Sequence, residues 1–135
     1  MGNDTAVEKL MTTELVTVSP NTEITEAANT LLTQQAGSLV ALDDQKQVSG
    51  ILTCTDLAAL VAENSVSTDV TVEEYMTSEV VTVSPEASLQ DAAVKMITAG
   101  IQHLPVTDGD DEMVGMLSTT DITNHLTIAG SMGTS

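Results

Sequence analysis

The chain repeats itself, and this repetition constrains the fold more than any other feature of the sequence. When Val7 is aligned with Val72, the two halves stay in register without a gap as far as Asp56 and Asp121. VEKLMTTELVTVSP in the first copy becomes VEEYMTSEVVTVSP in the second. Self-similarity of this length indicates two copies of one supersecondary unit. The sequence therefore predicts two domains, at residues 7–62 and 72–128. A linker at 63–71 joins them, and a loose tail follows at 129–135.

Both copies show the same order of strand and helix patterns. In the first copy, alternating or continuous apolar residues predict strands at 16–18, 39–42 and 48–52. An apolar stripe at helical spacing predicts a helix over 23–35, and a second helix is expected at 56–62. The second copy gives strands at 80–83, 103–106 and 113–117 and helices at 89–99 and 120–127.

The expected fold class is therefore α/β (α+β), built from two tandem β-α-β-β-α units. One such unit can hardly bury its own apolar stripe. We therefore expect the two copies to pack sheet against sheet in pseudo-two-fold symmetry.

Each copy contains a strand that runs directly into a helix, GILTCTD at residues 50–56 and GMLSTTD at 115–121. A hydroxyl residue, Thr53 or Ser118, stands three residues before an aspartate. A helix start offers free N–H groups and the positive end of the helix dipole, where polar ligands bind. The same spacing also describes a capping box, which satisfies those N–H groups without any ligand. Both roles can coexist.

The charge balance excludes several functions. Asp and Glu number 20 against three basic residues, which gives a formal net charge of −17. Nucleic-acid binding needs a basic face, so we exclude it. No apolar run approaches the length of a membrane span, and no signal peptide is visible, so we expect a cytoplasmic protein without membrane contact. The acidity fits adaptation to a salt-loaded, haloarchaeal cytoplasm, where salt screens the self-repulsion; a surface for a basic partner protein is the alternative.

The residues that carry chemistry are few. The sequence contains no nucleophile–base pair, no metal-ligand cluster and no glycine-rich phosphate loop, so we expect neither an enzyme nor a metal site. Cys54 stands near a helix start and is either a stabilised thiolate or a small spacer. The acidic turns at 43–44 and 108–112 lack the ligand spacing of a calcium loop and indicate solvated turns.

The repeated unit, together with the phrases TVSP, GIQHLPV and G-h-h-[ST]-x-x-D, resembles the CBS domain family (cystathionine β-synthase domains). The paired form of this domain is often called a Bateman module, and the resemblance covers residues 7–128. It implies a regulatory module that binds AMP, ADP, ATP or S-adenosylmethionine in clefts between the copies, requires no cofactor, and signals to a partner protein. A structural or interaction module with empty clefts is the alternative function.

The resemblance also implies which residues contact the ligand. The aspartate of the strand-to-helix motif would accept hydrogen bonds from ribose hydroxyls, and the Ser or Thr would help to hold ribose or phosphate. The adenine would lie against the TV segment and the start of the following strand. The residues implied are Thr17, Val18, Ser38, Leu39, Thr53 and Asp56 in the first copy, and Thr82, Val83, Ile101, His103, Leu104, Pro105, Ser118 and Asp121 in the second.

The two copies differ where a phosphate would bind. His103 in the second copy is matched by Ser38 in the first, and Pro105 by Val40. His103 is either a partly buried structural histidine or, when protonated, a phosphate contact. We therefore expect one dominant site, which prefers AMP or S-adenosylmethionine over ATP.

We also expect a homodimer. The predicted helices carry flat stripes of small and apolar residues, and a single pair of domains would leave part of them in water. The stripe residues are Ala27, Ala28, Leu31, Ala92, Ala93 and Met96.

Overall fold

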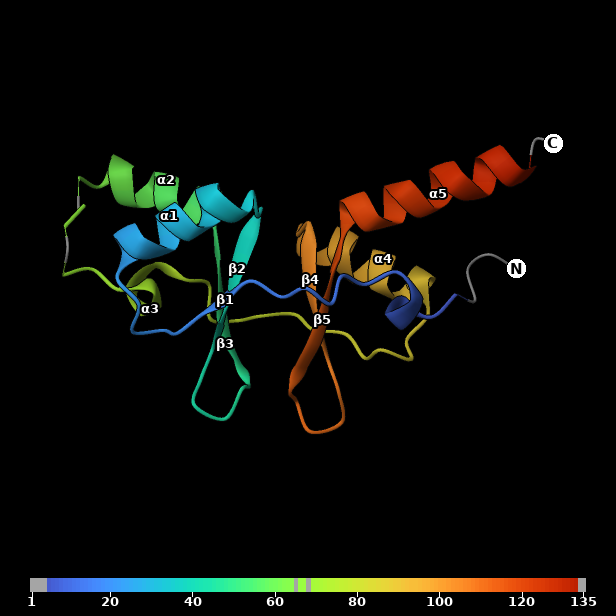
Figure 1. Cartoon of the computed structure of the whole chain (residues 1–135), viewed down its shortest axis with the longest axis horizontal. Coiled ribbons are helices and arrows are strands. Elements are labelled where there is room, and N and C mark those ends of the chain that lie inside the picture. Colours follow the sequence, from blue (N-terminus) through green and yellow to red (C-terminus); the bar gives the residue numbers. More distant parts are fainter. Residues whose placement is uncertain (1–4, 65, 68, 134–135) are drawn as a thin grey trace. The chain divides into compact units, whose positions relative to one another are not determined.

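The computed structural model describes residues 5–64, 66–67 and 69–133, and the chain divides into two compact units (Figure 1). The first-copy unit is Val16–Val80. The second-copy unit combines Met1–Leu15 with Val81–Ser135. The compact units therefore divide the chain differently from the sequence repeats, because the segment that opens each repeat joins the unit of the other repeat.

The first-copy unit is a small mixed sheet covered by helices. Strand β2 lies at the centre, parallel to β1 and antiparallel to β3, and Leu39 pairs with Leu52 across β2 and β3. Helices α1 and α2 both pack on the sheet face that carries these two leucines. The elements are β1 (Thr17–Val18), α1 (Ile24–Gln34), β2 (Ser38–Leu42), β3 (Val48–Thr53), α2 (Cys54–Ala62) and the short α3 (Val72–Tyr75).

The second-copy unit repeats this arrangement around the antiparallel pair β4–β5. The strand predicted at residues 80–83 is not formed as such; Val83 makes an isolated parallel bridge to Val106 at the place that β1 takes in the other unit. The elements are the 3₁₀ turn η2 (Val7–Lys9), α4 (Leu89–Ala99), β4 (His103–Thr107), β5 (Met113–Ser118) and α5 (Thr119–Gly133).

The helices that follow β3 and β5 differ from the prediction at their ends. α2 begins at Cys54, two residues before Asp56, because Thr53 is the N-cap and the helix starts at the residue after its cap. α5 continues through Gly133, beyond the end predicted at residue 127. The predicted loose tail is therefore helical as far as Gly133, and residues 134 and 135 lie outside the described part of the chain.

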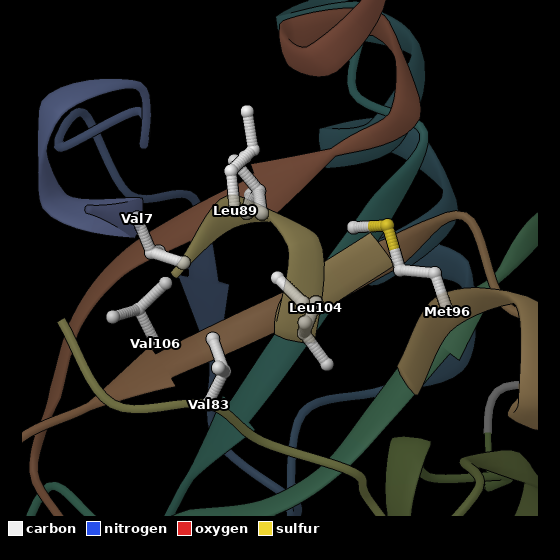
Figure 2. Packing of buried hydrophobic residues seen from close by; sticks show 8 residues of the cluster. Val7, Val83, Leu89, Met96, Leu104 and Val106 are labelled. Carbon is white, nitrogen blue, oxygen red and sulfur yellow. The ribbon is translucent and has the colours of Figure 1, made fainter. Parts of the chain in front are cut away.

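Each unit has its own aliphatic core. The residues alternate along the strands, so that Leu104 and Val106 of β4 point to the helices while Pro105 points to the opposite face. Figure 2 shows the second-copy core, in which Val7 lies among side chains from the strands and α4. Its buried members are Val7, Val83, Leu89, Ala92, Met96, Leu104, Val106 and Leu117. Those of the first-copy core are Ile24, Ala27, Leu31, Leu39, Ala41, Leu52, Leu60 and Val72.

The helical stripes expected to form a dimer interface are largely used inside these cores. Ala27 and Leu31 of α1, and Ala92 and Met96 of α4, are buried against the sheet of their own unit. Ala28 and Ala93 of the same stripes are only half-buried, so the stripes are divided between the core and the surface, and the small buried alanines let each helix approach its sheet.

The two repeats exchange the segments that open them. Val7, from the start of the first repeat, is buried in the second-copy core, and its N–H donates to Ala87 O at 2.9 Å. Val72, from the start of the second repeat, is buried in the first-copy core, and its N–H donates to Thr22 O at 2.9 Å. The same contacts thus recur at matching positions of the duplication.

The glycine of each strand-to-helix motif lies under the exchanged segment. A Cβ built on Gly50 would lie 2.5 Å from Sδ of Met76, and one built on Gly115 would collide with Sδ and Cγ of Met11. These contacts explain why each copy of the motif opens with a residue that has no side chain.

We predict that Gly115→Ala lowers the free energy of unfolding by about 1–3 kcal/mol, because Met11 must move to admit the methyl group. Urea titration measures this loss. Gly109→Ala is the matched control, since a Cβ there meets nothing within 4 Å. Equal stability of the two alanine variants would contradict this account of the glycine.

Candidate ligand-binding site

The strand-to-helix motif forms the same hydrogen-bonded corner in both units. In the second-copy unit, Ser118 N–H donates to Asp121 Oδ2 at 2.9 Å, and Asp121 N–H donates to Ser118 Oγ at 3.1 Å. In the first-copy unit, Thr53 N–H donates to Asp56 Oδ2 at 2.9 Å and Asp56 N–H to Thr53 Oγ1 at 3.3 Å. Both motifs are therefore capping boxes, and these capping bonds use only Oδ2 of each carboxylate.

Strand pairing brings the start of β2 or β4 to this corner. Ser38 stands opposite Thr53, and His103 stands opposite Ser118. Directly opposed residues of an antiparallel pair are close neighbours. The Asp121 carboxylate acts to raise the pKa of the His103 imidazole, as expected of a nearby negative charge. Each unit therefore gathers a hydroxyl, an aspartate and one further polar residue at one end of its sheet.

The TV segments run along the outer edge of β2 and β4. Val83 N–H donates to Pro105 O at 3.1 Å, and its carbonyl accepts from Thr107 N–H at 2.9 Å, so the main chain of Val83 faces β4. Main-chain groups alternate in direction along an extended segment, so the carbonyl of Thr82 points away from β4. That carbonyl accepts a hydrogen bond from Lys95 Nζ at 2.7 Å.

Several of the predicted contact residues are buried in the cores. Leu39, Val83, Leu104 and Pro105 have almost no exposed surface, so a ligand would meet them only through their main chain. Ser38 is also buried, with 7% of its surface exposed. The predicted residues with a larger exposed share are Thr17, Val18, Thr53, Asp56, Thr82, Ile101, His103, Ser118 and Asp121.

The sequence did not single out Lys95. It lies on α4, and its distance in sequence from Thr82 hides the contact. Two features of the sequence could have drawn attention to Lys95. It is one of only three lysines in a chain without arginine, and the equivalent position of the first copy holds Thr30.

Burial determines the charge of His103. Desolvation lowers its pKa below the usual 6.5, and the nearby Asp121 carboxylate opposes this only in part. The imidazole is therefore neutral at pH 7. It can exchange hydrogen bonds with a ligand, but it would supply the cationic phosphate contact considered from the sequence only if a bound anion raised its pKa.

The remaining polar features are structural. Asp43 Oδ1 accepts from Gln45 N–H and Asp108 Oδ1 accepts from Asp110 N–H, so these acidic residues order the hairpin turns. Cys54 is exposed at the start of α2. Among the described residues, no group of three or more His, Cys, Asp or Glu is placed to hold a metal ion, and no helix is long and apolar enough to cross a membrane.

We predict that acidification destabilises the protein through His103. Its pKa is lower in the folded than in the unfolded chain, so the unfolded chain binds the proton first, and stability falls as the pH drops below about 6.5. Urea unfolding of the wild type between about pH 7.5 and pH 5.5 should show a greater loss than that of His103→Gln. Parallel losses in both proteins would exclude this role for the histidine.

Comparison with known proteins identifies the family. Residues 7–63 and 72–128 each match the CBS domain, so the chain belongs to the CBS domain family as a tandem pair. An uncharacterised 17.7 kDa protein of Acidianus ambivalens is 34% identical over 122 residues, which cover 90% of this chain and 73% of that protein. The chain also matches a homoserine O-acetyltransferase of Methanococcus vannielii at 29% identity, but it spans only 25% of that protein's length.

Solved CBS pairs share the fold. The CBS domain pair of MJ0100, in complex with 5′-methylthioadenosine and S-adenosylmethionine, has a TM-score of 0.83 and 30% identity, and covers 90% of this chain and 95% of its own. CBSX2 in complex with AMP has a TM-score of 0.81 and 26% identity, with coverages of 92% and 98%. CBS-pair proteins are regulatory modules, and related pairs bind small adenosine-containing molecules.

Proposed function

We propose that this chain is a cytoplasmic regulatory module that binds an adenosine-containing ligand, AMP or S-adenosylmethionine, and signals its presence to a partner protein. The observation that carries the proposal is the corner formed by Ser118 and Asp121, in which the capping bonds occupy Oδ2 of the aspartate. A carboxylate accepts several hydrogen bonds, so the second oxygen suits a pair of ribose hydroxyls. Thr53 and Asp56 offer the same arrangement in the first copy.

The charge of the protein supports a ligand with few negative charges. A triphosphate would add several negative charges to a chain that already carries −17 and has no arginine to receive them bidentately. N–H groups at a helix start suit one phosphate better than three. AMP or the sulfonium compound S-adenosylmethionine is therefore favoured over ATP.

Binding at this corner would act on the exchanged segment. Met116 lies two residues before Ser118 on β5, and its main chain exchanges hydrogen bonds with Thr12 at 2.8 and 2.9 Å. A ligand that fixes Ser118 would thus also stabilise the strand that holds the N-terminal segment. This segment and α5 are the parts through which we expect a partner protein to sense the ligand.

We predict that AMP or S-adenosylmethionine binds in calorimetric titration and that ATP binds more weakly. Asp121→Asn should lower the affinity about tenfold or more, because it replaces a charged acceptor with a group that is partly a donor. The asparagine oxygen can still accept from Ser118 N–H, so the helix cap is kept. Asp56→Asn is the matched variant in the other copy and should have a smaller effect.

Two outcomes would contradict this proposal. Absence of binding by the wild type to any adenosine compound would favour a structural or interaction module with unoccupied sites. Equal binding of ATP by both copies, or unchanged affinity in Asp121→Asn, would reject the preferred site.

We also propose that the protein is a homodimer that associates through exposed apolar residues on its helices. Four of the six large apolar residues left in water in the described part of the chain recur at matching positions of the two copies, Leu32 with Ile97 and Val61 with Leu126, whereas Val66 and Val94 have no apolar counterpart. The exposed fractions of Leu32, Ile97, Val61 and Leu126 are 79%, 80%, 66% and 63% respectively. These four residues define the exposed apolar set, which differs from the stripe residues that the sequence analysis named for the dimer interface.

The charge distribution favours a second copy of this chain as the occupant of these surfaces. α1 and α2 carry one charged residue each, Glu26 and Asp56, both in the first turn, and α5 carries Asp121 in its first turn. α4, which carries Ile97, has two charged residues of opposite sign, Asp91 and Lys95. The exposed apolar residues lie beyond these charges. Two chains with a net charge of −17 each repel each other least where their surfaces carry few charges. A basic partner protein would instead bind the acidic surface elsewhere.

We predict a dimer by light scattering in about 2 M KCl, where the Debye length is only a few ångströms and the acidic surfaces of the chain are screened. Ile97→Glu combined with Leu126→Glu should shift the protein to the monomer. Val66→Glu is the control, because Val66 is also exposed but lies outside the helices. A monomeric wild type, or equal dissociation of the control, would contradict the interface.

A further inference from the structure

Two methionines at matching positions of the repeats hold the exchanged segments against their strands. A Cβ built on Gly50 of β3 would lie 2.5 Å from Sδ of Met76, and one built on Gly115 of β5 would collide with Sδ of Met11. Each sulfur atom therefore packs directly on the main chain of a glycine, with no space for one further atom between them. Both methionines also pack against the aliphatic core of the unit in which they lie.

The main chain of each segment is bonded to its strand at the residue that follows the methionine. Thr12 exchanges two hydrogen bonds with Met116, at 2.8 and 2.9 Å, and Thr77 exchanges two with Ile51, both at 2.9 Å. Both pairs are isolated bridges and do not continue as a ladder. The sulfur contact and this single bridge therefore fix each segment on its strand.

Met11 and Met76 keep part of their surface in water, so a small oxidant can reach them. Both residues are half-buried, whereas Met96 lies in the second-copy core with 3% of its surface exposed. Oxidation of a methionine converts a flexible apolar side chain into a polar, chiral sulfoxide and is reversed by methionine sulfoxide reductases.

We propose that Met11 and Met76 are paired modification sites, at which a peroxide converts the thioether to a sulfoxide and releases the exchanged segment from its strand. In this step the O–O bond of hydrogen peroxide breaks, one oxygen bonds to Sδ, and the other leaves as water with both hydrogens. The sulfur is oxidised by two electrons and the peroxide is reduced by two. This inference goes beyond the proposed function and does not depend on it.

The sulfoxide does not fit the packed position of the thioether. Its oxygen has no room on the side of the glycine, and the core beside it is apolar. Burial of a polar group without a hydrogen-bond partner is unfavourable, so the oxidised side chain moves out and the bridge of Thr12 or Thr77 opens with it. β5 and β3 continue from these glycines to Ser118 and Thr53, so the strand that leads to each corner loses its outer support.

Hydrogen exchange of main-chain amides measures the release of the segments. We expect hydrogen peroxide to add one oxygen each to Met11 and Met76 of the whole protein, as mapped by mass spectrometry of its peptides. The amides of Thr12 and Thr77, each bonded to a strand carbonyl, should then exchange about tenfold faster. Amides in the middle of the β4–β5 ladder should change less. Treatment with methionine sulfoxide reductases should restore the protection.

Two leucine variants separate these methionines from others in the chain. Met113→Leu combined with Met116→Leu removes the half-buried methionines of β5 and should keep the full response of the two bridge amides to peroxide. Met11→Leu combined with Met76→Leu keeps an apolar side chain of similar volume without the thioether, and it should lose the response. Each variant is compared with itself before and after treatment, so a change in its starting stability does not enter the result.

If the variant at positions 11 and 76 does not fold, the first variant alone provides the test. Exchange of its bridge amides should then rise in proportion to the fraction of sulfoxide at Met11 and Met76.

Three results would overturn the inference. In the first, Met11 and Met76 stay unoxidised while Met113 and Met116 are oxidised. In the second, oxidation of Met11 and Met76 leaves the exchange of the bridge amides unchanged. In the third, the leucine variant at positions 11 and 76 responds to peroxide as the wild type does. The proposed function stands or falls separately, because these measurements are made without a ligand.

Discussion

Each of the two small cores depends on a valine that comes from the other repeat. The chain has no Phe or Trp and one aromatic residue, so the cores consist of aliphatic side chains on short strands and helices. Val7 and Val72 are completely buried, and the segments that carry them hydrogen-bond to the loop ahead of α4 or α1. The same segments place Met11 and Met76 over the glycines of β5 and β3. The outer edge of each of these strands, and hence the hydroxyl and aspartate at its end, is therefore held in place by residues that belong to the opposite copy.

Local sequence patterns predicted most of the secondary structure, but they could not predict that the opening segments of the two repeats are exchanged. Most strands and helices and both capping boxes follow from spacing over a few residues and were confirmed, whereas the strand predicted at residues 80–83 is reduced to one bridge at Val83 and α5 extends to Gly133. VEKLM and VEEYM, however, are so alike that either segment suits either sheet, and hydrophobic pattern alone does not decide between them. The apolar stripes of α1 and α4 were likewise visible in the sequence. Which residues of these stripes are buried depends on the tertiary packing, in which Ala27 is buried and Leu32 is exposed.

The candidate sites show the same division between local and long-range information. Ser118 and Asp121 are neighbours in sequence, so their contact was predictable, but the contact of Lys95 with Thr82 requires the whole turn from the TV segment through α4. The charge state of His103 depends on burial, which a sequence does not give directly. The duplication has therefore kept its packing positions nearly unchanged, while some polar positions have diverged, with Ser38 matched by His103 and Thr30 by Lys95.

The exchanged segments also determine where the chain can be divided. A fragment cut at the repeat boundary, residues 7–71, would carry Val7 without the core that buries it and would lack Val72. A fragment of residues 16–80 contains every buried residue of the first-copy core in continuous sequence. The second-copy core has no such fragment, because its parts stand at opposite ends of the chain. Only a circular permutation that joins the residues around Val7 to the end of α5 would present that unit as one uninterrupted polypeptide.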